Sequence, residues 1–301
     1  MEEKKKCLVI IDSNALVHRA YHALPPFRTK KGELVNAVYG YFSILLKVLK
    51  ELKPDYIAAT FDFPAPNFRH KKFTEYKAKR VKAPDELYEQ IPKIKEILNC
   101  FQIPIFEEQG FEADDLIATI ANTPHHFYSK SGGGPKIETI ILTGDLDALQ
   151  LVNQNVKVYT LGKGIKDTVI YDEEKIKERF GILPKQVVDF KALAGDPSDN
   201  IPGAAGIGKK TAVELLQEYG SIENLYKTIE AGEAWDLKTK IKELLLNCKE
   251  QVFFSYDLAK ARTDAPLVFN LAKCERKGYN KEKVVEILKK YSFYSLINRI
   301  P

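Results

Sequence analysis

Three apolar runs of this chain each end at an aspartate. They are Cys7–Asp12, Tyr56–Asp62 and Thr139–Asp145. Runs of this length and composition predict buried β-strands. Ligands of an open parallel sheet bind at the carboxyl ends of its strands, so the three aspartates are expected to meet at one edge. Clustered carboxylates need a cation to balance their charge, and hard divalent cations prefer oxygen ligands. The pattern therefore indicates a carboxylate metal site.

Six further acids lie close to this pattern along the chain. They are Glu112, Asp114, Asp115, Asp147, Asp196 and Asp199. Asp145 and Asp147 are two residues apart, so in extended backbone both side chains would point the same way. Acids of this kind also offset helix dipoles and start turns, and each one alone has an equally good structural explanation. Nine acids in five short segments are harder to explain in that way.

Composition places the chain among ordinary globular proteins. It has 301 residues, 45% of them hydrophobic and 29% charged, enough for one large domain or two small ones. We find no apolar stretch of membrane-spanning length and no signal peptide. The four cysteines lie far apart and no H-E-x-x-H motif occurs, which argues against disulfides and a zinc hydrolase and favours a reducing compartment.

The net charge is only +5, although nine acids are clustered. The remaining surface is accordingly more basic than this figure suggests. An acidic basin within a basic surface suits a polyanionic substrate. A solvated surface of mixed sign is the alternative that net charge alone would favour.

The elements that must position these acids alternate between strand and helix over the first ~175 residues. This alternation predicts an α/β fold with a mainly parallel central sheet flanked by helices. Further strands are expected at 103–106, 137–143, 155–160 and 168–171, and helices at 15–22, 36–52, 84–100 and from 112. Segment 64–83 is rich in Lys, Arg and His with little apolar periodicity, so it is expected to be exposed and mobile. A glycine-rich surface loop is expected at 131–135. From about residue 172 only helices are expected, at 172–180, 184–194, 209–219, 221–231, 237–248 and 281–290.

The glycine-rich segment 202–212 could be one of two binding motifs, a phosphate-binding loop or a helix-hairpin-helix. Gly203–Lys209 fits G-x-x-x-x-G-K, but Lys210 stands where a phosphate-binding loop carries Ser or Thr, and a polar turn precedes it instead of a strand. A nucleotide triphosphatase is therefore disfavoured. A helix-hairpin-helix fits better. Gly206 and Gly208 would let the backbone approach a partner, and the start of the second helix would face a phosphate beside Lys209 and Lys210. Such a contact reads no base sequence. A tight helix–helix turn with glycine caps is the structural alternative.

Taken together, these segments resemble the 5′-nuclease (flap endonuclease) superfamily, most closely the N-terminal 5′→3′ exonuclease domain of bacterial DNA polymerase I. The resemblance covers essentially the whole chain. Its landmarks are Ile11–Asp12, His18–Leu24, Thr60–Asp62, Ala65–His70, Glu75–Arg80, Glu112–Asp115, Leu142–Asp147, Gly195–Gly203 and Gly206–Ala212. Their joint occurrence in this order is highly specific.

The resemblance implies a PIN-like 5′-nuclease core over 1–175, with an arch segment at about 64–90. A helical DNA-binding part would follow over 176–301, with the helix-hairpin-helix at about 184–219. It further implies two Mg²⁺ or Mn²⁺ ions, and K⁺ is an additional candidate at the hairpin. The implied metal-site residues are Asp12, Asp62, Glu112, Asp114, Asp115, Asp145 and Asp147, completed by Asp196 and Asp199 at the second position. All nine acids are present, which argues against an inactive relative.

Other roles follow from the same resemblance. Lys77 and Arg80 match basic residues that reach the scissile phosphate. The implied DNA contacts are Arg19, Tyr21, Arg69 and Tyr76, with Gly203, Gly206, Gly208, Lys209, Lys210 and Thr211 at the hairpin. Among these, Tyr21 and Tyr76 match aromatic residues near unpaired DNA.

The implied activity is structure-specific, metal-dependent 5′→3′ exonuclease and flap endonuclease cleavage in replication and repair. The expected partners are branched or nicked duplex DNA with a 5′ flap, RNA primers, and a DNA polymerase in cis or in trans. A monomer in the cytoplasm, at the bacterial nucleoid, is expected. The chain ends at Pro301, where a polymerase would follow in that family, so a stand-alone nuclease and an excised domain both stay open. A non-catalytic branched-DNA-binding module and a nucleotide triphosphatase are the alternative classes. Magnesium-dependent cleavage of a 5′ flap without added nucleotide would separate all three.

Overall fold

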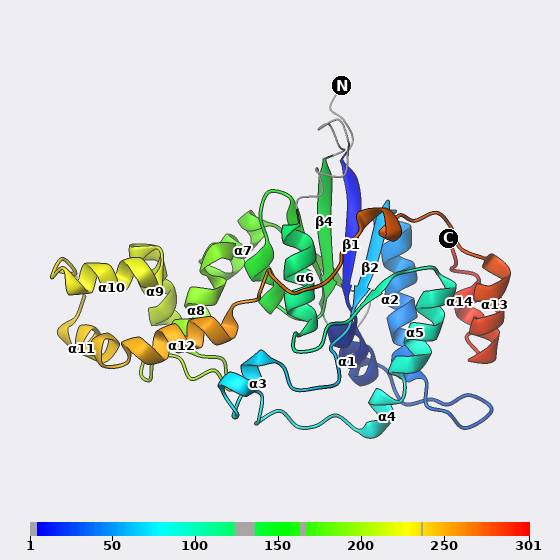
Figure 1. Ribbon diagram of the computed structural model, residues 1–301, viewed down its shortest axis with the longest axis horizontal. Coiled ribbons are helices and arrows are strands. Elements are labelled where there is room, and N and C mark those ends of the chain that lie inside the picture. The colour runs from blue at the N-terminus through cyan, green and yellow to red at the C-terminus, as the bar shows by residue number, and fades with distance from the viewer. Residues whose placement is uncertain (1–4, 124–135, 163–166, 236) are drawn as a thin grey trace.

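The computed structural model describes residues 5–123, 136–162, 167–235 and 237–301 (Figure 1). A sheet stands in the middle, with helices on both sides and a further group of helices extending from one end. The predicted loop at 131–135 lies outside the described residues.

Within the described residues, one sheet of six strands has the order β3-β2-β1-β4-β5-β6. The first five strands pair in parallel and β6 pairs antiparallel with β5. Their bounds are β1 (Lys6–Asp12), β2 (Tyr56–Thr60), β3 (Ile105–Phe106), β4 (Ile137–Thr143), β5 (Val156–Leu161) and β6 (Thr168–Tyr171). The central strands read as continuous apolar runs because helices cover both faces. The predicted α/β class with a mainly parallel sheet is confirmed.

Each face of the sheet has its own hydrophobic core. Along β1, Val9 and Ile11 face one core and Leu8 and Ile10 face the other, as the two-residue period of a strand requires. The first core also contains α1 (Ser13–Ala23), α2 (Asn36–Leu52), α4 (Asp85–Tyr88), α5 (Ile91–Cys100), α13 (Lys281–Lys290) and α14 (Tyr294–Ile297). The second contains α6 (Ala113–Asn122), the 3₁₀ helix η2 (Asp147–Leu151) and α7 (Glu173–Phe180), together with the C-terminal helical group.

The helical group forms the left end of the molecule in Figure 1. It consists of η3 (Pro184–Gln186), α8 (Val187–Ala194), α9 (Lys209–Tyr219), α10 (Ile222–Glu230), α11 (Thr239–Asn247) and α12 (Lys249–Ala259), and the turn η4 (Leu271–Cys274) follows it. Helix α12 packs on α8 and was not predicted from the sequence. Its buried residues Val252, Ser255 and Leu258 are three apart, but partly buried aromatic residues between them obscure this period.

The helix predicted over 84–100 is two helices. Helix α4 ends at Tyr88 and α5 begins at Ile91. Pro92 explains the break, because its ring lacks an N–H and clashes with the carbonyl four residues earlier. The fully buried Gln90 at the junction accepts hydrogen bonds from the N–H groups of Ala37 (2.9 Å) and Val38 (3.3 Å). The Gln90 side chain at this break therefore caps the start of α2.

The predicted arch segment, residues 64–90, is only partly exposed. It contains α3 (Phe68–Lys72), which begins where the Asn67 side chain accepts from the N–H groups of Arg69 and His70. Asn67, Arg69 and Tyr76 are buried, so the expectation of an exposed segment is wrong at these positions. The number of basic residues predicted exposure of this segment, but Arg69 can be buried because the buried carboxylates of Glu112 and Asp115 neutralise its charge.

In the part of the chain that the structure describes, none of the helices combines the length and the apolar character needed to cross a bilayer.

Candidate active site

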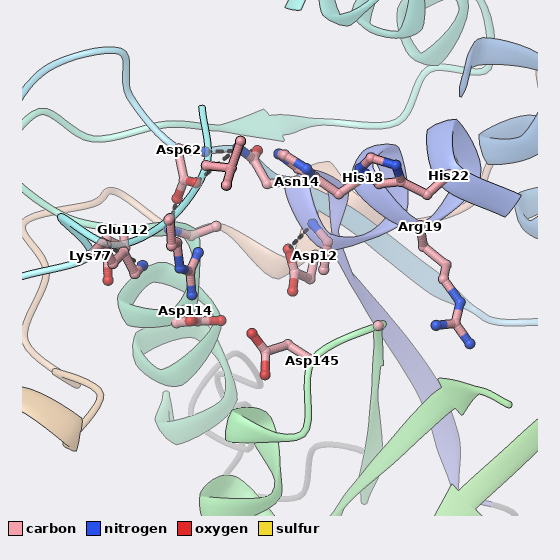
Figure 2. Close-up of a pocket in the computed structure, with 15 residues that line it drawn as sticks. Asp12, Asn14, His18, Arg19, His22, Asp62, Lys77, Glu112, Asp114 and Asp145 are labelled. Atoms are coloured by element: carbon pink, nitrogen blue, oxygen red, sulfur yellow. Dashed lines mark hydrogen bonds and ion pairs between the residues drawn. The ribbon is translucent and has the colours of Figure 1, made fainter. Parts of the chain in front are cut away.

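The carboxyl ends of β1, β2 and β4 meet at one edge of the sheet. Asp12 is the last residue of β1, while Asp62 and Asp145 follow two residues after β2 and β4. The three residues line a cavity of about 560 Å³, together with Glu112 and Asp114 from the start of α6. We call these five residues the first cluster. In Figure 2 the carboxylates of Asp114 and Asp145 point toward one another. The structure thus brings together the strand-end acids that the sequence placed at one edge.

The first cluster is short of positive charge at its centre. Asp12 is buried and accepts hydrogen bonds from Thr143 Oγ1 (2.6 Å) and the Ala15 N–H (3.0 Å). Burial, with the charges of Asp145 and Asp62, nevertheless raises the pKa of Asp12 to about 7. Burial, Asp12 and Asp145 also raise the pKa of Asp114 well above its ordinary value. Such crowding is relieved by a proton or by a bound cation.

A second cluster lies beside the first. Ligand oxygens of Asp147, Asp196 and Asp199 all lie within 4.8 Å of one another. Asp147 was predicted to point with Asp145 from extended backbone, and this is wrong. Asp147 begins the 3₁₀ helix η2, and its N–H donates to Asp145 Oδ1 (2.9 Å). The turn sends the two carboxylates to different clusters.

Lys191 of α8 is a site residue that sequence analysis missed. Its Nζ lies 2.6 Å from Asp196 Oδ2 and also contacts Asp147. Burial would raise the pKa of Asp196, but Lys191 outweighs it and holds the pKa at about 2. For Asp147, burial and Asp145 outweigh Lys191, and the pKa rises to about 6. Lys191 and Asp196 are five residues apart in the sequence, and this spacing does not predict that their side chains are in contact.

Two basic residues of the arch segment reach the acids. Lys77 Nζ lies 2.6 Å from Glu112 Oε1, and Arg80 pairs with Asp199. Burial alone would raise the pKa of Glu112, but Lys77 and Arg69 hold it below its ordinary value. Lys77 takes up a left-handed backbone conformation with φ 57°, which is uncommon outside glycine. The segment therefore carries one cation to each cluster.

Asp115 and Arg69 form a buried pair behind the cavity. Arg69 Nη1 and Nη2 donate to Asp115 Oδ2 and Oδ1, both at 2.8 Å, and Nη1 also donates to Glu112 (3.1 Å). The remaining Arg69 donors bind the carbonyls of Leu258 and Lys260. The structure does not bring Asp115 to the cavity, and it gives Arg69 no surface for DNA. The sequence assigned them separately, as ligand and DNA contact, because a buried pair leaves no local pattern.

The remaining predicted contacts on the core lie near the cavity wall. Arg19 of α1 lines the cavity and donates to the Leu161 carbonyl (3.2 Å). Tyr21 is half-buried and packs edge-on against His22. His18 and His22 also line the cavity, although sequence analysis gave neither a role. Tyr76 is buried, with its hydroxyl between Glu112 and Asp199, so it offers no face to unpaired DNA.

The hairpin connects α8 to α9, and no strand precedes it, which argues against a phosphate-binding loop. Two of its glycines are required by the fold. Both have a positive φ, 65° at Gly203 and 94° at Gly206, which disfavours any residue with a side chain, and a Cβ on Gly203 would also lie 2.3 Å from the Gly195 nitrogen. Gly208 differs, because a Cβ there would meet nothing within 4 Å. The structural alternative, a tight turn between two helices, accounts for Gly203 and Gly206, and it leaves the open space at Gly208 to a functional explanation.

Gly208 is the N-cap residue of α9, so the first N–H groups of that helix follow it. Lys209 and Lys210 are exposed beside this helix start, and Thr211 is half-buried. Lys210 lies 3.9 Å from Glu214 in an exposed pair, which is worth little. An exposed helix start with two lysines is suited to binding an anion.

Comparisons with known proteins agree on the type of chain. Residues 7–181 match the family described as "5'-3' exonuclease, N-terminal resolvase-like domain", and residues 182–282 match "5'-3' exonuclease, C-terminal SAM fold". DNA polymerase I of Bacillus subtilis is 41% identical over 300 residues, all of this chain and 33% of the relative. DNA polymerase I of Caldicellulosiruptor bescii is 41% identical over 295 residues, 97% of this chain and 33% of the relative. The chain thus spans about a third of the length of these curated relatives.

Solved structures share the fold at lower identity. A bacteriophage T5 flap endonuclease in complex with DNA and metal ions superposes with a TM-score of 0.67 at 22% identity, covering 94% of this chain and 100% of that one. The catalytic core of Rad2 with DNA substrate gives 0.58 at 17% identity, covering 99% and 92%. These likenesses extend over both the sheet and the helical group. The family matches and the fold lead to one conclusion: this chain belongs to the 5′-3′ exonuclease family.

Proposed function

We propose that this chain is a structure-specific, metal-dependent 5′-nuclease that hydrolyses phosphodiesters of DNA and of RNA-primer/DNA junctions. Family membership supports the reaction class. The observation that carries the proposal is the pair of carboxylate clusters at one end of the sheet, with Lys77 against the first and Arg80 against the second. A protein that only bound DNA would gain nothing from so many acids at its contact surface.

The donor set fits two hard divalent cations, Mg²⁺ or Mn²⁺. All candidate ligand atoms are carboxylate oxygens, which these ions prefer. Burial and the neighbouring charges of Asp145 and Asp62 raise the pKa of Asp12, and a bound cation would offset both by stabilising the carboxylate form. The first cluster would hold one ion, and Asp147, Asp196 and Asp199 would hold the other, while Asp115 would support Glu112 through Arg69. When bound, two such ions activate water and stabilise the attacking and leaving oxygens of an in-line displacement.

Lys77 and Arg80 are proposed to act on the scissile phosphate. In the free protein they neutralise Glu112 and Asp199. Once other cations neutralise those carboxylates, both side chains become available to the substrate. Positive charge aimed at the phosphate stabilises the charge that develops there in the transition state. The two residues would therefore neutralise carboxylates before metal and substrate bind and assist catalysis afterwards.

The hairpin is proposed to hold the duplex through a backbone phosphate. Support comes from the open space at Gly208 and from the exposed Lys209 and Lys210 at the start of α9. Contacts of this kind are independent of base sequence and weaken as salt rises. K⁺ at the hairpin is supported by the family resemblance alone. Residues 1–175 would supply the first cluster and the basic residues of the arch segment, and residues 176–301 would supply Asp196, Asp199 and most of this grip.

The proposed substrate is nicked or branched duplex DNA with a 5′ flap, including RNA primers. The related T5 flap endonuclease and the Rad2 core were both solved with DNA. Removal of primers and flaps in replication and repair, by a monomer at the bacterial nucleoid, is the corresponding role. The relatives named DNA polymerase I suggest a polymerase as partner, in cis or in trans.

The decisive experiment incubates the purified chain with a labelled 5′-flap duplex and Mg²⁺, without any nucleotide. We expect cleavage near the flap junction, short 5′-phosphorylated products, and complete loss of cleavage in EDTA. A matched substrate with an RNA flap tests the primer assignment. Cleavage that requires ATP would favour a nucleotide triphosphatase. Tight flap binding with no cleavage in Mg²⁺ or Mn²⁺ would favour a non-catalytic module.

A further inference from the structure

We propose that Tyr76 is a positioning residue whose buried hydroxyl sets the separation of the two carboxylate clusters. The inference rests on the proposed function and deepens it. Tyr76 is 4% exposed, and its hydroxyl oxygen lies 3.1 Å from Glu112 Oε2 and 3.2 Å from Asp199 Oδ2. Glu112 belongs to the first cluster and Asp199 to the second. One side chain therefore contacts a candidate ligand of each ion.

The geometry indicates that this hydroxyl serves both carboxylates at once. A phenol carries a single proton, and an ordinary O–H···O bond measures about 2.7–2.8 Å. Here the two distances are nearly equal, and both exceed that value, as expected for a proton shared between two acceptors. Moving either carboxylate away from the hydroxyl would leave the proton bonded to the other carboxylate alone. Tyr76 therefore couples the position of Glu112 to that of Asp199.

Each of the two carboxylates binds Tyr76 through one oxygen and a basic side chain of the arch segment through the other. Glu112 Oε1 pairs with Lys77, and Asp199 Oδ1 pairs with the exposed Arg80. Glu112 Oε2, on the tyrosine side, is held additionally by Arg69 at 3.1 Å. When Lys77 and Arg80 turn toward a phosphate, each carboxylate keeps one anchored oxygen and presents the other. Tyr76 would preserve the orientation of both during that exchange.

The fold fastens Tyr76 on both sides. The Lys77 N–H donates to the Asp199 carbonyl (2.9 Å), and Asn200 Nδ2 donates to the Glu75 carbonyl (2.8 Å). The Tyr76 ring packs with Ile201 and Leu258 in a small core cluster. A ring enclosed in this way cannot also stack on an unpaired base. The structure thus favours a positioning role over the aromatic DNA contact that the resemblance implied.

Tyr76→Phe tests this role because it removes only the hydroxyl. Tyr226→Phe is the matched control, since the buried Tyr226 hydroxyl donates to the Leu245 carbonyl (3.0 Å) in the helical group, away from the acids. Mn²⁺ binding to each 301-residue variant without DNA is titrated by electron paramagnetic resonance. Loss of an outer hydrogen-bond partner of a metal ligand typically weakens metal affinity about 10- to 100-fold. We expect such a loss in Tyr76→Phe for the ion of the second cluster, because Arg69 still holds Glu112 at the first, together with altered Mn–Mn spin coupling, while Tyr226→Phe retains both ions.

Two further measurements separate the possible outcomes. Melting temperatures check that both variants are folded to a similar extent. Affinity for a flap duplex in Ca²⁺ should be unchanged in Tyr76→Phe. Wild-type Mn²⁺ binding by Tyr76→Phe would overturn the positioning role, and weak DNA binding by Tyr76→Leu would then favour the stacking role. That result leaves the proposed nuclease function intact, whereas a wild-type chain that binds no Mn²⁺ overturns both.

Discussion

The first carboxylate cluster and the hairpin are assembled in opposite ways. The cluster draws its five acids from four places in the chain, between Asp12 and Asp145, and they line one cavity and repel one another. The hairpin residues are nearly consecutive, from Gly203 to Thr211, and its two lysines are exposed. Residues that interact directly act as a unit, whereas separate exposed contacts add independently. A change at the cluster should therefore abolish chemistry, and a change at the hairpin should only reduce grip.

The largest effect is expected from Asp145→Ala. Cleavage of a 5′ flap in Mg²⁺ should fall by several orders of magnitude, because no neighbouring carboxylate replaces the lost oxygens. The fold should survive, since removing one crowded carboxylate relieves repulsion. Single-turnover cleavage and circular dichroism together check both points. Asp264→Ala is the matched control, because Asp264 is exposed and pairs with Arg262. Near-normal cleavage by folded Asp145→Ala would remove the cluster from the chemistry.

A smaller effect is expected at the boundary between the two regions, from Lys77→Ala. Loss of one donor to a transition state typically lowers the rate about 100- to 1,000-fold. The single-turnover rate at saturating enzyme should fall more than flap affinity, because Lys77 binds Glu112 before the reaction. Lys82→Ala is the control in the same segment, since Lys82 is exposed and pairs with Asp85. An equal loss of affinity with an unchanged cleavage step would make Lys77 a docking residue like those of the hairpin.

The hairpin itself is tested by Lys209→Ala combined with Lys210→Ala. Each lost phosphate contact should reduce the slope of log affinity against log salt by about 0.9 on duplex DNA. Binding should weaken to the same extent on unrelated sequences, and cleavage at saturating enzyme should be retained. Lys281→Ala with Lys283→Ala is the control, because these exposed lysines lie on α13 at the opposite end of the molecule. If affinity and slope do not change, the hairpin is only a turn between helices.

The smallest effect concerns stability without metal. Folding raises the pKa of Asp12 from 3.8 to about 7, so the folded state holds this proton more tightly than the unfolded state. The free energy of unfolding should therefore decline as pH rises from about 4 to about 7. Urea unfolding in EDTA at pH 5, 6, 7 and 8 measures this decline, and Asp12→Asn should flatten it. Mg²⁺ added at pH 8 should restore stability to the wild type. Identical pH dependence in both proteins would show that the Asp12 carboxyl does not cause the decline in stability.

Local sequence was sufficient for the features that depend on neighbouring residues. Apolar runs predicted β1, β2 and β4, since strands covered on both faces contain few polar residues. Their parallel order then brought the strand-end aspartates to one edge. The helices predicted at 36–52 and 209–219 match α2 and α9 at their observed bounds. The segment after α11 was left unassigned because its aromatic residues show no helical period, although packing on α8 makes it helix α12.

The sequence by itself determined the α/β class, the identity of the acids and the glycine hairpin, because each depends on composition or short-range spacing. Tertiary structure alone decided which acids work together. Asp147 lies in the second cluster because it begins a 3₁₀ helix, and Asp115 lies away from the cavity because it forms a buried ion pair with Arg69. It also placed Lys191 between Asp147 and Asp196 and the Tyr76 hydroxyl between Glu112 and Asp199. These contacts join residues up to 123 positions apart, and their energies depend on burial and charge that no local pattern records.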